Sequence, residues 1–506
     1  MYGVSLKSLL LLILLVLYSQ GKAQLFNGDN YVVIQGNEGE ADRIRKAVHV
    51  VPSLRQLQWQ ELELTGFLHF GINTFTNREW GDGTEDPKLF NPSQLDARQW
   101  VRACKLAGIR SVILTAKHHD GFCLWPSRYT EHSVKNSPWK GGNGDVVQEV
   151  AAACKEYDVG FGIYLSPWDR HEASFGDSAT YNDYFVNQLT ELLTQYGKIA
   201  EVWFDGANGE GPHGKKQVYD FNRWYALIRK LQPQAVIAVM GPDVRWVGTE
   251  TGRGRETEWS VVPADAQLQE TIAAHSQQQL AFVPANRMEE DLGSREQLRK
   301  AKSLVWYPAE TDVSIRPGWF YHASEDSLVK TASELMDIYY ESVGRNGVLL
   351  LNIPPDRRGL LCDADLKQLA EWTRLRQQTF KNNLLRKASL RTSGRNARAL
   401  VDHQSSTWWT TQKNDTIGVI EFQLKQEQEC DLLLLQEAIQ NGQRIERFVV
   451  EYREGAEWKW LTEGTTVGYK RILRFPLKRV QFLRIRILSS RLNPMLAEAG
   501  LYRQAR

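Results

Sequence analysis

Chemically versatile side chains recur along the first half of the chain, each group coming directly after a short apolar run. The groups are His69 with Asn73, Glu79 and Trp80; His118 with His119 and Asp120; Tyr164 with Asp169; Trp203 with Asp205; and Asp243 with Arg245, Trp246 and Glu250. A buried structural role explains one histidine beside an apolar run. It does not explain three histidines and several separate carboxylates in equivalent places. We therefore expect these side chains to meet in one site.

Metal-dependent hydrolysis is one chemistry for such a set, with His118, His119, Asp120 and Asp205 as ligands. Adjacent residues on a strand point to opposite faces, so His118 and His119 could share a metal ion only if the strand has already ended. The HxH spacing that would place two imidazoles on one side is absent, and the five cysteines show no CxxC or Cys/His ligand spacing. The sequence therefore predicts no metal and no organic cofactor.

Glycoside hydrolysis is the other chemistry, because it needs two carboxylates that flank the scissile bond. A bound sugar buries many hydroxyl groups, and each unpaired one costs about 1 to 3 kcal/mol. Histidine, asparagine, tyrosine and the indole N–H are suitable partners. The mouth of the expected site is also rich in tryptophan: Trp80, Trp125, Trp168, Trp203, Trp246 and Trp319.

The elements that must position these residues alternate between strands and helices. Strands are predicted at residues 66–72, 110–116, 159–165, 200–204 and 235–239, and helices at 94–107, 145–157, 181–196 and 218–231. Further strands are predicted at 303–306 and 347–352, after a long polar loop over 250–302. Near-continuous apolar strands separated by helices indicate a buried parallel sheet. A doubly wound sheet is the alternative, but no GxGxxG follows the first strand, and a (β/α)8-like TIM-type barrel is favoured. In such a barrel the chemistry lies at the C-terminal ends of the strands.

The last part of the chain has a different pattern of predicted secondary structure. Short β-prone segments without intervening helices cover residues 419–423, 430–435, 447–452, 470–476 and 480–487. This spacing predicts a C-terminal antiparallel β-sandwich over 385–506, after a catalytic domain over 24–380. The segments 406–410, 419–423 and 448–452 resemble discoidin-like carbohydrate-binding sandwiches. A role in sugar binding and a role in bracing the barrel both remain open.

The first residues predict export. Lys7 precedes the apolar run 9–18, and Gly21-Lys-Ala23 is a small-x-small pattern, so residues 1–23 are expected to be a signal peptide. An N-terminal membrane anchor is the alternative, although ten apolar residues are too few to span a bilayer. We expect a secreted protein, periplasmic if the source has two membranes. The formal charge of +2 over 506 residues argues against a nucleic-acid binder.

Four ordered motifs carry a family resemblance. The segments 69–75 (HFGINTF), 115–122 (TAKHHDGF), 164–169 (YLSPWD) and 201–206 (EVWFDG) resemble the retaining α-L-fucosidases over roughly residues 60–360. Segments 166–170, 206–211 and 316–322 resemble the subgroup that prefers α-1,3/1,4-linked fucose on branched Lewis-type glycans. The resemblance implies an exo-acting enzyme with a fucosylated oligosaccharide or glycoconjugate as its substrate.

The resemblance also implies roles for the two carboxylates. Asp205 matches the nucleophile, which would form a covalent fucosyl-enzyme. Glu250 matches the general acid/base in the subgroup pattern, with Thr249 standing where that pattern has asparagine. Glu310 is the rival for this role, and Glu201 and Glu258 are further alternatives. For a retaining pair, the carboxyl groups are expected about 5 to 5.5 Å apart.

Substrate-binding roles follow from the same resemblance. His69, His118 and His119 would bind sugar hydroxyls, with Glu79, Trp80 and Tyr164 beside them, and Trp203 and Trp319 would form an apolar wall for the C5 methyl group. Asp169, Arg170, Asp243 and Arg245 would either meet the branching sugar or be solvated loop charges. Two alternatives stay open: a broad-specificity α-L-fucosidase, and a carbohydrate-binding protein without turnover.

Overall fold

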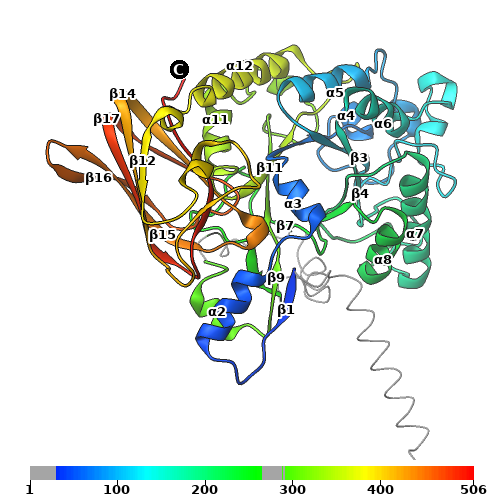
Figure 1. Ribbon diagram of the computed structural model, residues 1–506. Helices are drawn as coiled ribbons and strands as arrows, with labels where there is room; N and C mark the ends of the chain where they lie inside the picture. The colour runs from blue at the N-terminus through cyan, green and yellow to red at the C-terminus, as the bar shows by residue number, and fades with distance from the viewer. Residues whose placement is uncertain (1–29, 265–287, 289–290, 506) are drawn as a thin grey trace, which may run out of the picture.

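The computed structural model describes residues 30–264, 288 and 291–505, so the predicted signal peptide and part of the predicted loop over 250–302 lie outside the described residues. A barrel of parallel strands and an antiparallel domain lie side by side (Figure 1). Helix α12 runs along the top of the molecule from one to the other. The predicted fold class is confirmed.

Eight parallel strands form the barrel, in the order β6-β5-β4-β3-β2-β11-β10-β7. They are β2 (Leu64–Leu68), β3 (Ser111–Lys117), β4 (Gly160–Leu165), β5 (Glu201–Phe204), β6 (Val236–Val239), β7 (Arg245–Trp246), β10 (Ala309–Ser314) and β11 (Gly347–Asn352). Every residue of β3, β10 and β11 is buried, as expected for strands covered on both faces. The order leaves the barrel nearly closed, with β6 and β7 at its two ends.

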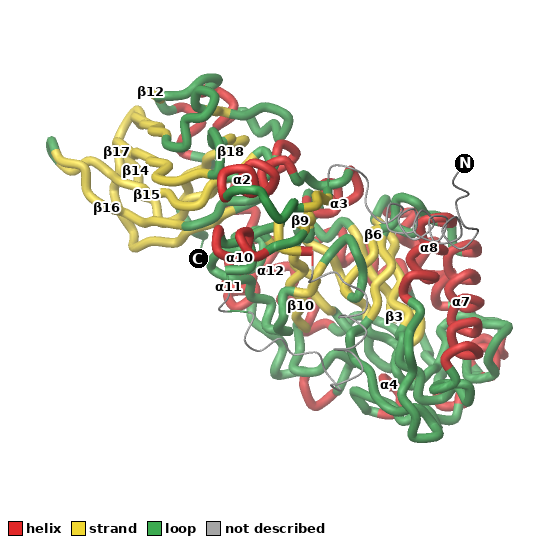
Figure 2. The backbone as a smooth tube through the Cα atoms, turned by 90° about the horizontal axis from the view of Figure 1, so that it is seen from below, coloured by secondary structure: helices red, strands yellow, loops and turns green. Residues whose placement is uncertain are grey.

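Helices cover the outside of the barrel. They are α5 (Ala97–Leu106), α6 (Val146–Tyr157), α7 (Ser178–Gln195), α8 (Phe221–Leu231), α11 (Ala332–Glu341) and α12 (Asp363–Phe380). The first four each begin after an aspartate, Asp96, Asp145, Asp177 or Asp220, whose side chain accepts a hydrogen bond from a backbone N–H of the first turn. These caps satisfy donors that the helix itself leaves unpaired. Figure 2 shows α7 and α8 outside the strands.

One predicted strand forms but does not belong to the barrel. Residues 303–306 do form a strand, β9 (Ser303–Trp306), but it pairs antiparallel with β1 (Tyr31–Val33) and β8 (Val261–Pro263) in a separate sheet. Its Leu304 and Trp306 pack in a small core with α2 (Glu40–His49) and α10 (Arg295–Lys300). The barrel position goes instead to β7, whose two residues pair with β10 and are too short to give a sequence signal.

The C-terminal domain is one connected antiparallel sheet. Its strands are β12 (Ser389–Thr392), β13 (Trp409–Thr410), β14 (Gly418–Glu437), β15 (Ile445–Glu454), β16 (Glu457–Gly464), β17 (Arg471–Ser490) and β18 (Met495–Tyr502). The predicted pairs of short strands merge into β14 and β17, which are interrupted by register shifts. Strand β12 pairs with the first part of β14 and β18 with its second part, and apolar residues of both parts share one core. The sheet therefore folds over its own core.

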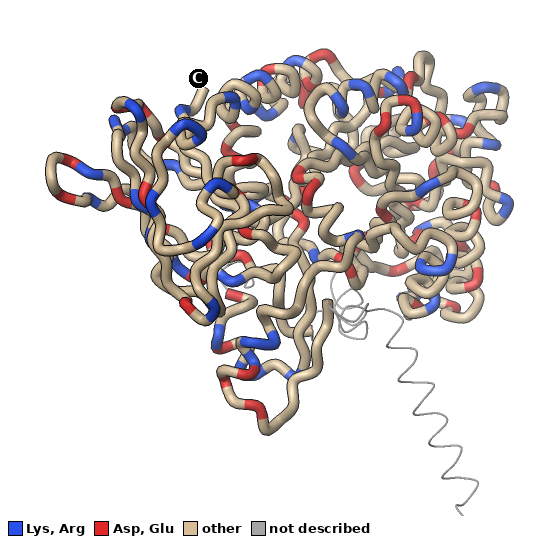
Figure 3. Tube along the Cα trace, viewed as in Figure 1, with Lys and Arg blue, Asp and Glu red and all other residues tan. Residues whose placement is uncertain are grey.

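Basic and acidic residues are intermingled along the trace of the barrel and of the antiparallel domain (Figure 3). No helix among the described residues has the length and apolar character to cross a membrane.

Candidate active site

Asp205 lies at the mouth of the barrel, directly after β5. Its Oδ1 accepts a hydrogen bond from the Ala207 backbone N–H (2.7 Å), and its Oδ2 accepts one from the Tyr164 hydroxyl (3.0 Å). Its side chain remains 25% exposed. Two donors therefore orient a carboxylate that a ligand can still reach.

His119 faces Asp205 from the end of β3. Its Nδ1 lies 2.8 Å from Ser166 Oγ, and that hydroxyl donates its one hydrogen to the Trp168 carbonyl (2.6 Å). Ser166 must therefore accept from the His119 Nδ1–H, which leaves the Nε2 lone pair free in the neutral ring. That lone pair lies 3.7 Å from Asp205 Oδ2. Burial lowers the pKa of His119 to about 4, so an incoming hydroxyl would meet two acceptors.

His69 is fixed in the same tautomer by a residue that the sequence argument did not single out. Asn352, the last residue of β11, uses its side-chain NH2 to donate to Ser314 Oγ (2.9 Å) and the Trp319 carbonyl (2.8 Å). Its Oδ1 therefore accepts from the His69 Nδ1–H (2.9 Å), and Nε2 is left as an acceptor. Burial lowers the pKa of His69 to about 3. The available signal was a polar residue that ends an apolar strand.

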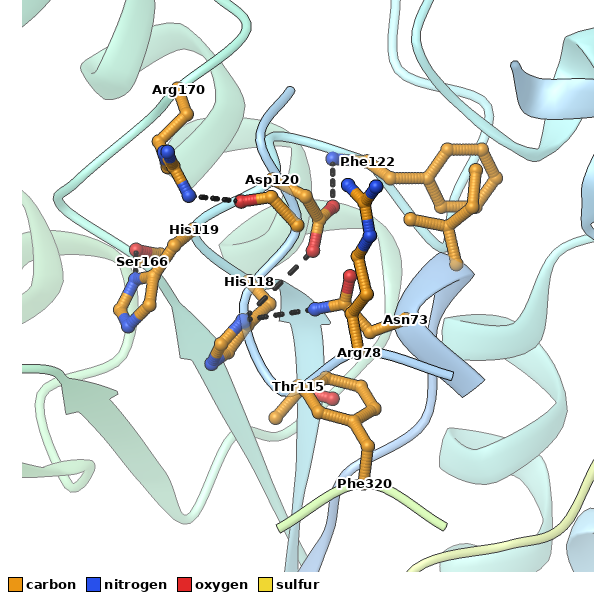
Figure 4. Close-up of polar contacts among 12 residues, drawn as sticks. Asn73, Arg78, Thr115, His118, His119, Asp120, Phe122, Ser166, Arg170 and Phe320 are labelled. Carbon is orange, nitrogen blue, oxygen red and sulfur yellow. Dashed lines mark hydrogen bonds and ion pairs between the residues drawn. The ribbon is translucent and has the colours of Figure 1, made fainter. Parts of the chain in front are cut away.

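His118 has the opposite tautomer. The Asn73 side-chain NH2 donates to its Nδ1 (3.4 Å), so the proton of the neutral ring is on Nε2, and burial holds its pKa well below the ordinary value. Strand β3 ends at Lys117, so His118 and His119 both point into the site, with ring centroids 4.0 Å apart (Figure 4). The pocket thus offers one imidazole donor and two imidazole acceptors, which suits the hydroxyls of a sugar.

Glu79 is tied to the loop that carries Trp319. Its Oε2 accepts from the Trp319 backbone N–H (2.7 Å), and its Oε1 accepts from the Phe320 backbone N–H (3.2 Å) and lies 2.6 Å from His322 Nε2. These contacts place the Trp319 ring 5.1 Å from the His69 ring. Glu79 holds one wall of the pocket in place.

The two other predicted tryptophans differ in exposure. Trp80 is 42% exposed and lies edge-on to His119, with 5.5 Å between ring centroids. Trp203 is buried, packs 5.1 Å from the Tyr164 ring and donates its indole N–H to Glu310 Oε1 (2.7 Å). Trp80 therefore lies at the rim and Trp203 on the floor.

Glu250 comes from the loop after β7. Its Oε2 accepts from the Trp319 indole N–H (3.3 Å). Loss of hydration raises the pKa of Glu250, and the negative charges of Asp205 and Glu79 raise it further against that hydrogen bond. Glu250 is exposed, and it is close enough to Asp205 for the charge of that carboxylate to raise its pKa. A general acid needs both properties, because it must contact the ligand and hold a proton.

Glu310 and Glu201 lie in the interior of the barrel, where each is at most 1% exposed. Glu201 Oε2 accepts from the Trp59 indole N–H (3.0 Å), just as Glu310 accepts from Trp203. The second oxygens, Glu201 Oε1 and Glu310 Oε2, have no other partner. Burial raises the pKa of both carboxyl groups, and the charge of Glu201 raises the pKa of Glu310 further, so the two groups share a proton inside the barrel rather than reach the mouth.

This pair predicts a pH dependence of stability. Burial raises the pKa of Glu201 to about 8, so the folded protein keeps a proton that the unfolded chain releases above its ordinary carboxyl pKa. We therefore expect the pair's contribution to the free energy of unfolding to fall as the pH rises from about 5 to about 8, by on the order of a few kcal/mol. Denaturant unfolding of wild type and Glu310→Gln across this range measures the difference. Parallel pH profiles for the two proteins would contradict the shared proton.

Other carboxylates that the sequence placed near the mouth form buried ion pairs instead. Glu258 contacts both Arg245 and Arg255 (3.2 Å for Arg255 Nη1). Asp243 pairs with Arg229 and Arg55, and Asp169 accepts from Lys117 Nζ (2.7 Å). All three carboxylates are buried. The expectation that Asp169, Asp243 and Arg245 meet a branching sugar is wrong, because each is paired inside the protein.

The candidate metal ligands lie near one another without the arrangement of a metal site. Within residues 30–264 and 291–505, no group of three or more histidine, cysteine or acidic side chains could hold a metal ion. In His118, Nδ1 is hydrogen-bonded to Asn73, and in His119, Nδ1 is hydrogen-bonded to Ser166, so one nitrogen of each ring already has a protein partner.

Comparisons with known proteins point to one family. The family model described as alpha-L-fucosidase matches residues 57–378. α-L-Fucosidase 1 of Arabidopsis thaliana is 44% identical over 465 residues, covering 89% of this chain and 87% of its own. A solved Bacteroides ovatus structure assigned as an α-L-fucosidase is 51% identical with a TM-score of 0.81, over 94% of this chain and 78% of its own. A Ruminococcus gnavus fucosidase solved with fucose is 33% identical with a TM-score of 0.79, over 90% of this chain and 95% of its own.

Proposed function

Because the chain belongs to the α-L-fucosidase family and is a glycoside hydrolase, we propose that it releases terminal α-1,3/1,4-linked fucose from branched Lewis-type glycans by retaining double displacement. The observation that carries the mechanism is the pairing of two carboxylates of opposite character at one mouth. Asp205 is oriented by two hydrogen-bond donors, whereas Glu250 has a raised pKa.

In the first step, a carboxylate oxygen of Asp205 attacks the anomeric carbon of fucose. Glu250 gives its proton to the glycosidic oxygen as the bond to the leaving sugar breaks. The Tyr164 hydroxyl donates a hydrogen bond to Asp205 Oδ2 and so keeps the carboxylate oriented toward the anomeric carbon. The product is a covalent fucosyl-enzyme and a free oligosaccharide.

In the second step, ionised Glu250 accepts a proton from water, which attacks the same anomeric carbon. The bond to Asp205 breaks, and fucose leaves with the configuration that it had in the glycan. Between these steps the sugar hydroxyls are held by the acceptor nitrogens of His69 and His119 and by the donor nitrogen of His118.

The substrate class is supported by the walls of the pocket. Trp319 and Trp203 give apolar surface where fucose carries a methyl group instead of a hydroxymethyl group. Trp80, exposed at the rim, offers a flat surface to a second sugar. The resemblance of segments 166–170, 206–211 and 316–322 to the α-1,3/1,4 subgroup supports the linkage.

The experiment is to measure fucose release from a Lewis-type trisaccharide, an α-1,2-fucosylated oligosaccharide and a simple aryl fucoside. Release from the branched trisaccharide alone is expected, and proton NMR should detect α-fucose as the first-formed anomer. Equal rates on all three would indicate a broad-specificity fucosidase. Release of β-fucose first would contradict double displacement, and no release would leave a carbohydrate-binding protein.

The proposed acid/base predicts the form of the pH–rate profile. Glu250 must be protonated in the first step, so kcat/KM should fall as the pH rises through its raised pKa. His69, with a pKa of about 3, and His119, with a pKa of about 4, stay neutral above pH 5 and add no ionisation there. A profile from pH 4 to 9 measures the basic limb. Persistence of that limb in Glu250→Gln, assayed with an activated fucoside, would contradict the assignment.

We also propose that the protein is exported. The support is the sequence of residues 1–23, a basic residue followed by a short apolar run and a small-x-small pattern. N-terminal sequencing of the protein from the extracellular or periplasmic fraction of its host should begin after Ala23. Recovery of the full-length chain with the membrane would indicate an anchor instead.

A further inference from the structure

The loop that carries Glu250 continues into a segment that lies between the barrel and the antiparallel domain. Its first part is bonded to the barrel. The Gly252 N–H donates to the Asp312 carbonyl (3.0 Å), the Gly254 N–H donates to the Glu341 carbonyl (2.7 Å), and Arg345 Nη1 donates to the Gly254 carbonyl (3.0 Å). Gly252 and Gly254 are therefore each held against the barrel by a backbone hydrogen bond.

Close packing leaves this part of the loop little freedom. Gly252 has a φ of +69°, and a Cβ atom there would come within 2.8 Å of Ile338 and 2.9 Å of Val313. The segment therefore fits this path in one position only, and Glu250, two residues before Gly252, keeps its place only while the segment stays seated there.

The next residues are held by the antiparallel domain. Arg471, the first residue of β17, donates to the Glu256 carbonyl (2.5 Å) and pairs with the Glu256 carboxylate. The Thr257 hydroxyl donates to Thr465 Oγ1 (2.8 Å), and the Glu258 N–H donates to Thr466 Oγ1 (3.1 Å). Three consecutive residues of the loop are thus bonded to one turn of the other domain.

That turn is itself anchored to the barrel. Lys470 pairs with Glu63, the Tyr469 N–H donates to Asn346 Oδ1 (2.7 Å), and the Ile472 N–H donates to the Gly344 carbonyl (2.9 Å). Arg471 is 2% exposed between these contacts. The turn 465–471 is a rigid support rather than a solvated loop.

We propose that Arg471, Thr465 and Thr466 of the antiparallel domain are positioning residues for Glu250. This inference rests on the proposed role of Glu250 as general acid/base. The C-terminal domain then does more than brace the barrel, because its β16–β17 turn sets the distance over which Glu250 delivers its proton to the leaving oxygen.

The test uses the dependence of proton delivery on the leaving group. A misplaced acid slows cleavage of a glycan, whose leaving alkoxide needs a proton, and spares an aryl fucoside whose phenolate leaves without one. In the full-length protein, Arg471→Met and Thr466→Val are expected to lower kcat/KM on the Lewis-type trisaccharide by about tenfold or more, since small misplacements are costly. On 2-chloro-4-nitrophenyl α-L-fucoside, the change should stay below about threefold. The basic limb of the pH profile should also shift in both variants.

The matched control is Lys470→Met. It removes the neighbouring interdomain ion pair with Glu63 without touching residues 251–260. A lower melting temperature with the same ratio of activities on the two substrates is expected for this control. Thr466→Val removes only a hydroxyl, so it keeps the test decisive if Arg471→Met does not fold.

Equal losses on the two substrates in Arg471→Met and Thr466→Val, or no loss in Thr466→Val, would overturn the proposal. Glu250→Ala is measured beside them to separate the two levels of inference. If Glu250→Ala shows the leaving-group dependence and the turn variants do not, the positioning role fails while the acid/base assignment stands. If Glu250→Ala lacks that dependence, the acid/base assignment fails and the positioning role fails with it.

Discussion

Replacement of Asp205 by alanine is expected to abolish turnover of every fucoside, lowering kcat/KM by on the order of 10⁴-fold or more. The reason is that the variant lacks the carboxylate that forms the covalent intermediate in the proposed mechanism. Asp205 is the carboxylate that Tyr164 and the Ala207 N–H orient at the mouth, and its neighbour His119 has no proton on the nitrogen that faces it. Initial rates on the trisaccharide and the aryl fucoside measure the effect.

Rescue by a small external nucleophile tests whether the loss of activity in Asp205→Ala is due to loss of the nucleophile. Azide added to Asp205→Ala should enter the space of the lost carboxylate and attack the anomeric carbon from the same face, giving β-fucosyl azide from an activated α-fucoside. Asp183→Ala, which removes an exposed carboxylate paired with Arg223, is the control for folding and general charge. Substantial turnover of the trisaccharide by Asp205→Ala would contradict the nucleophile assignment.

Replacement of Glu250 by alanine is expected to have the second largest effect, and that effect should differ between substrates with poor and with good leaving groups. General acid catalysis contributes about 10² to 10⁴-fold, so kcat/KM on the trisaccharide should fall by that factor. On 2-chloro-4-nitrophenyl α-L-fucoside the first step survives and the second, which needs a base, becomes limiting. Single-turnover and steady-state measurements separate the two steps.

Azide distinguishes this variant from the nucleophile variant. In Glu250→Ala it should intercept the fucosyl-enzyme from the side of the leaving group and give α-fucosyl azide, the opposite anomer. Glu310→Gln is the matched control, because Glu310 is the rival carboxylate and lies buried beneath Trp203. A larger loss in Glu310→Gln than in Glu250→Ala, with folding intact, would reverse the two assignments.

The residues of the site could be predicted because they follow apolar strands. His118, His119 and Asp205 each stand within two positions of a strand end, and the carboxyl ends of parallel strands meet at one mouth. The alternation of apolar runs and amphipathic stretches also located the helices, and in the structure an aspartate cap precedes each of α5 to α8. Periodicity and capping act over a few residues, so one sequence is enough to read them.

The tertiary structure decided which polar residues are free to act. Asp243, Arg245 and Glu258 stand beside Glu250 in the sequence, yet they are paired inside the protein with partners that no local pattern reveals. Asn352 fixes the tautomer of His69 from 283 positions away. The contact with His69 depends on the pairing of β2 with β11, the first and last strands of the barrel in the sequence.

The choice between Glu250 and Glu310 shows the division most clearly. By itself the sequence determined that the chain has a barrel, a mouth with histidines and carboxylates, and a nucleophile candidate after the fourth predicted strand. Only the tertiary structure placed Glu310 inside the barrel and Glu250 above the mouth. The physical reason is that Glu310, Thr311 and Asp312 of β10 interrupt the apolar pattern that marks a buried strand, although every residue of β10 is buried once the barrel has formed.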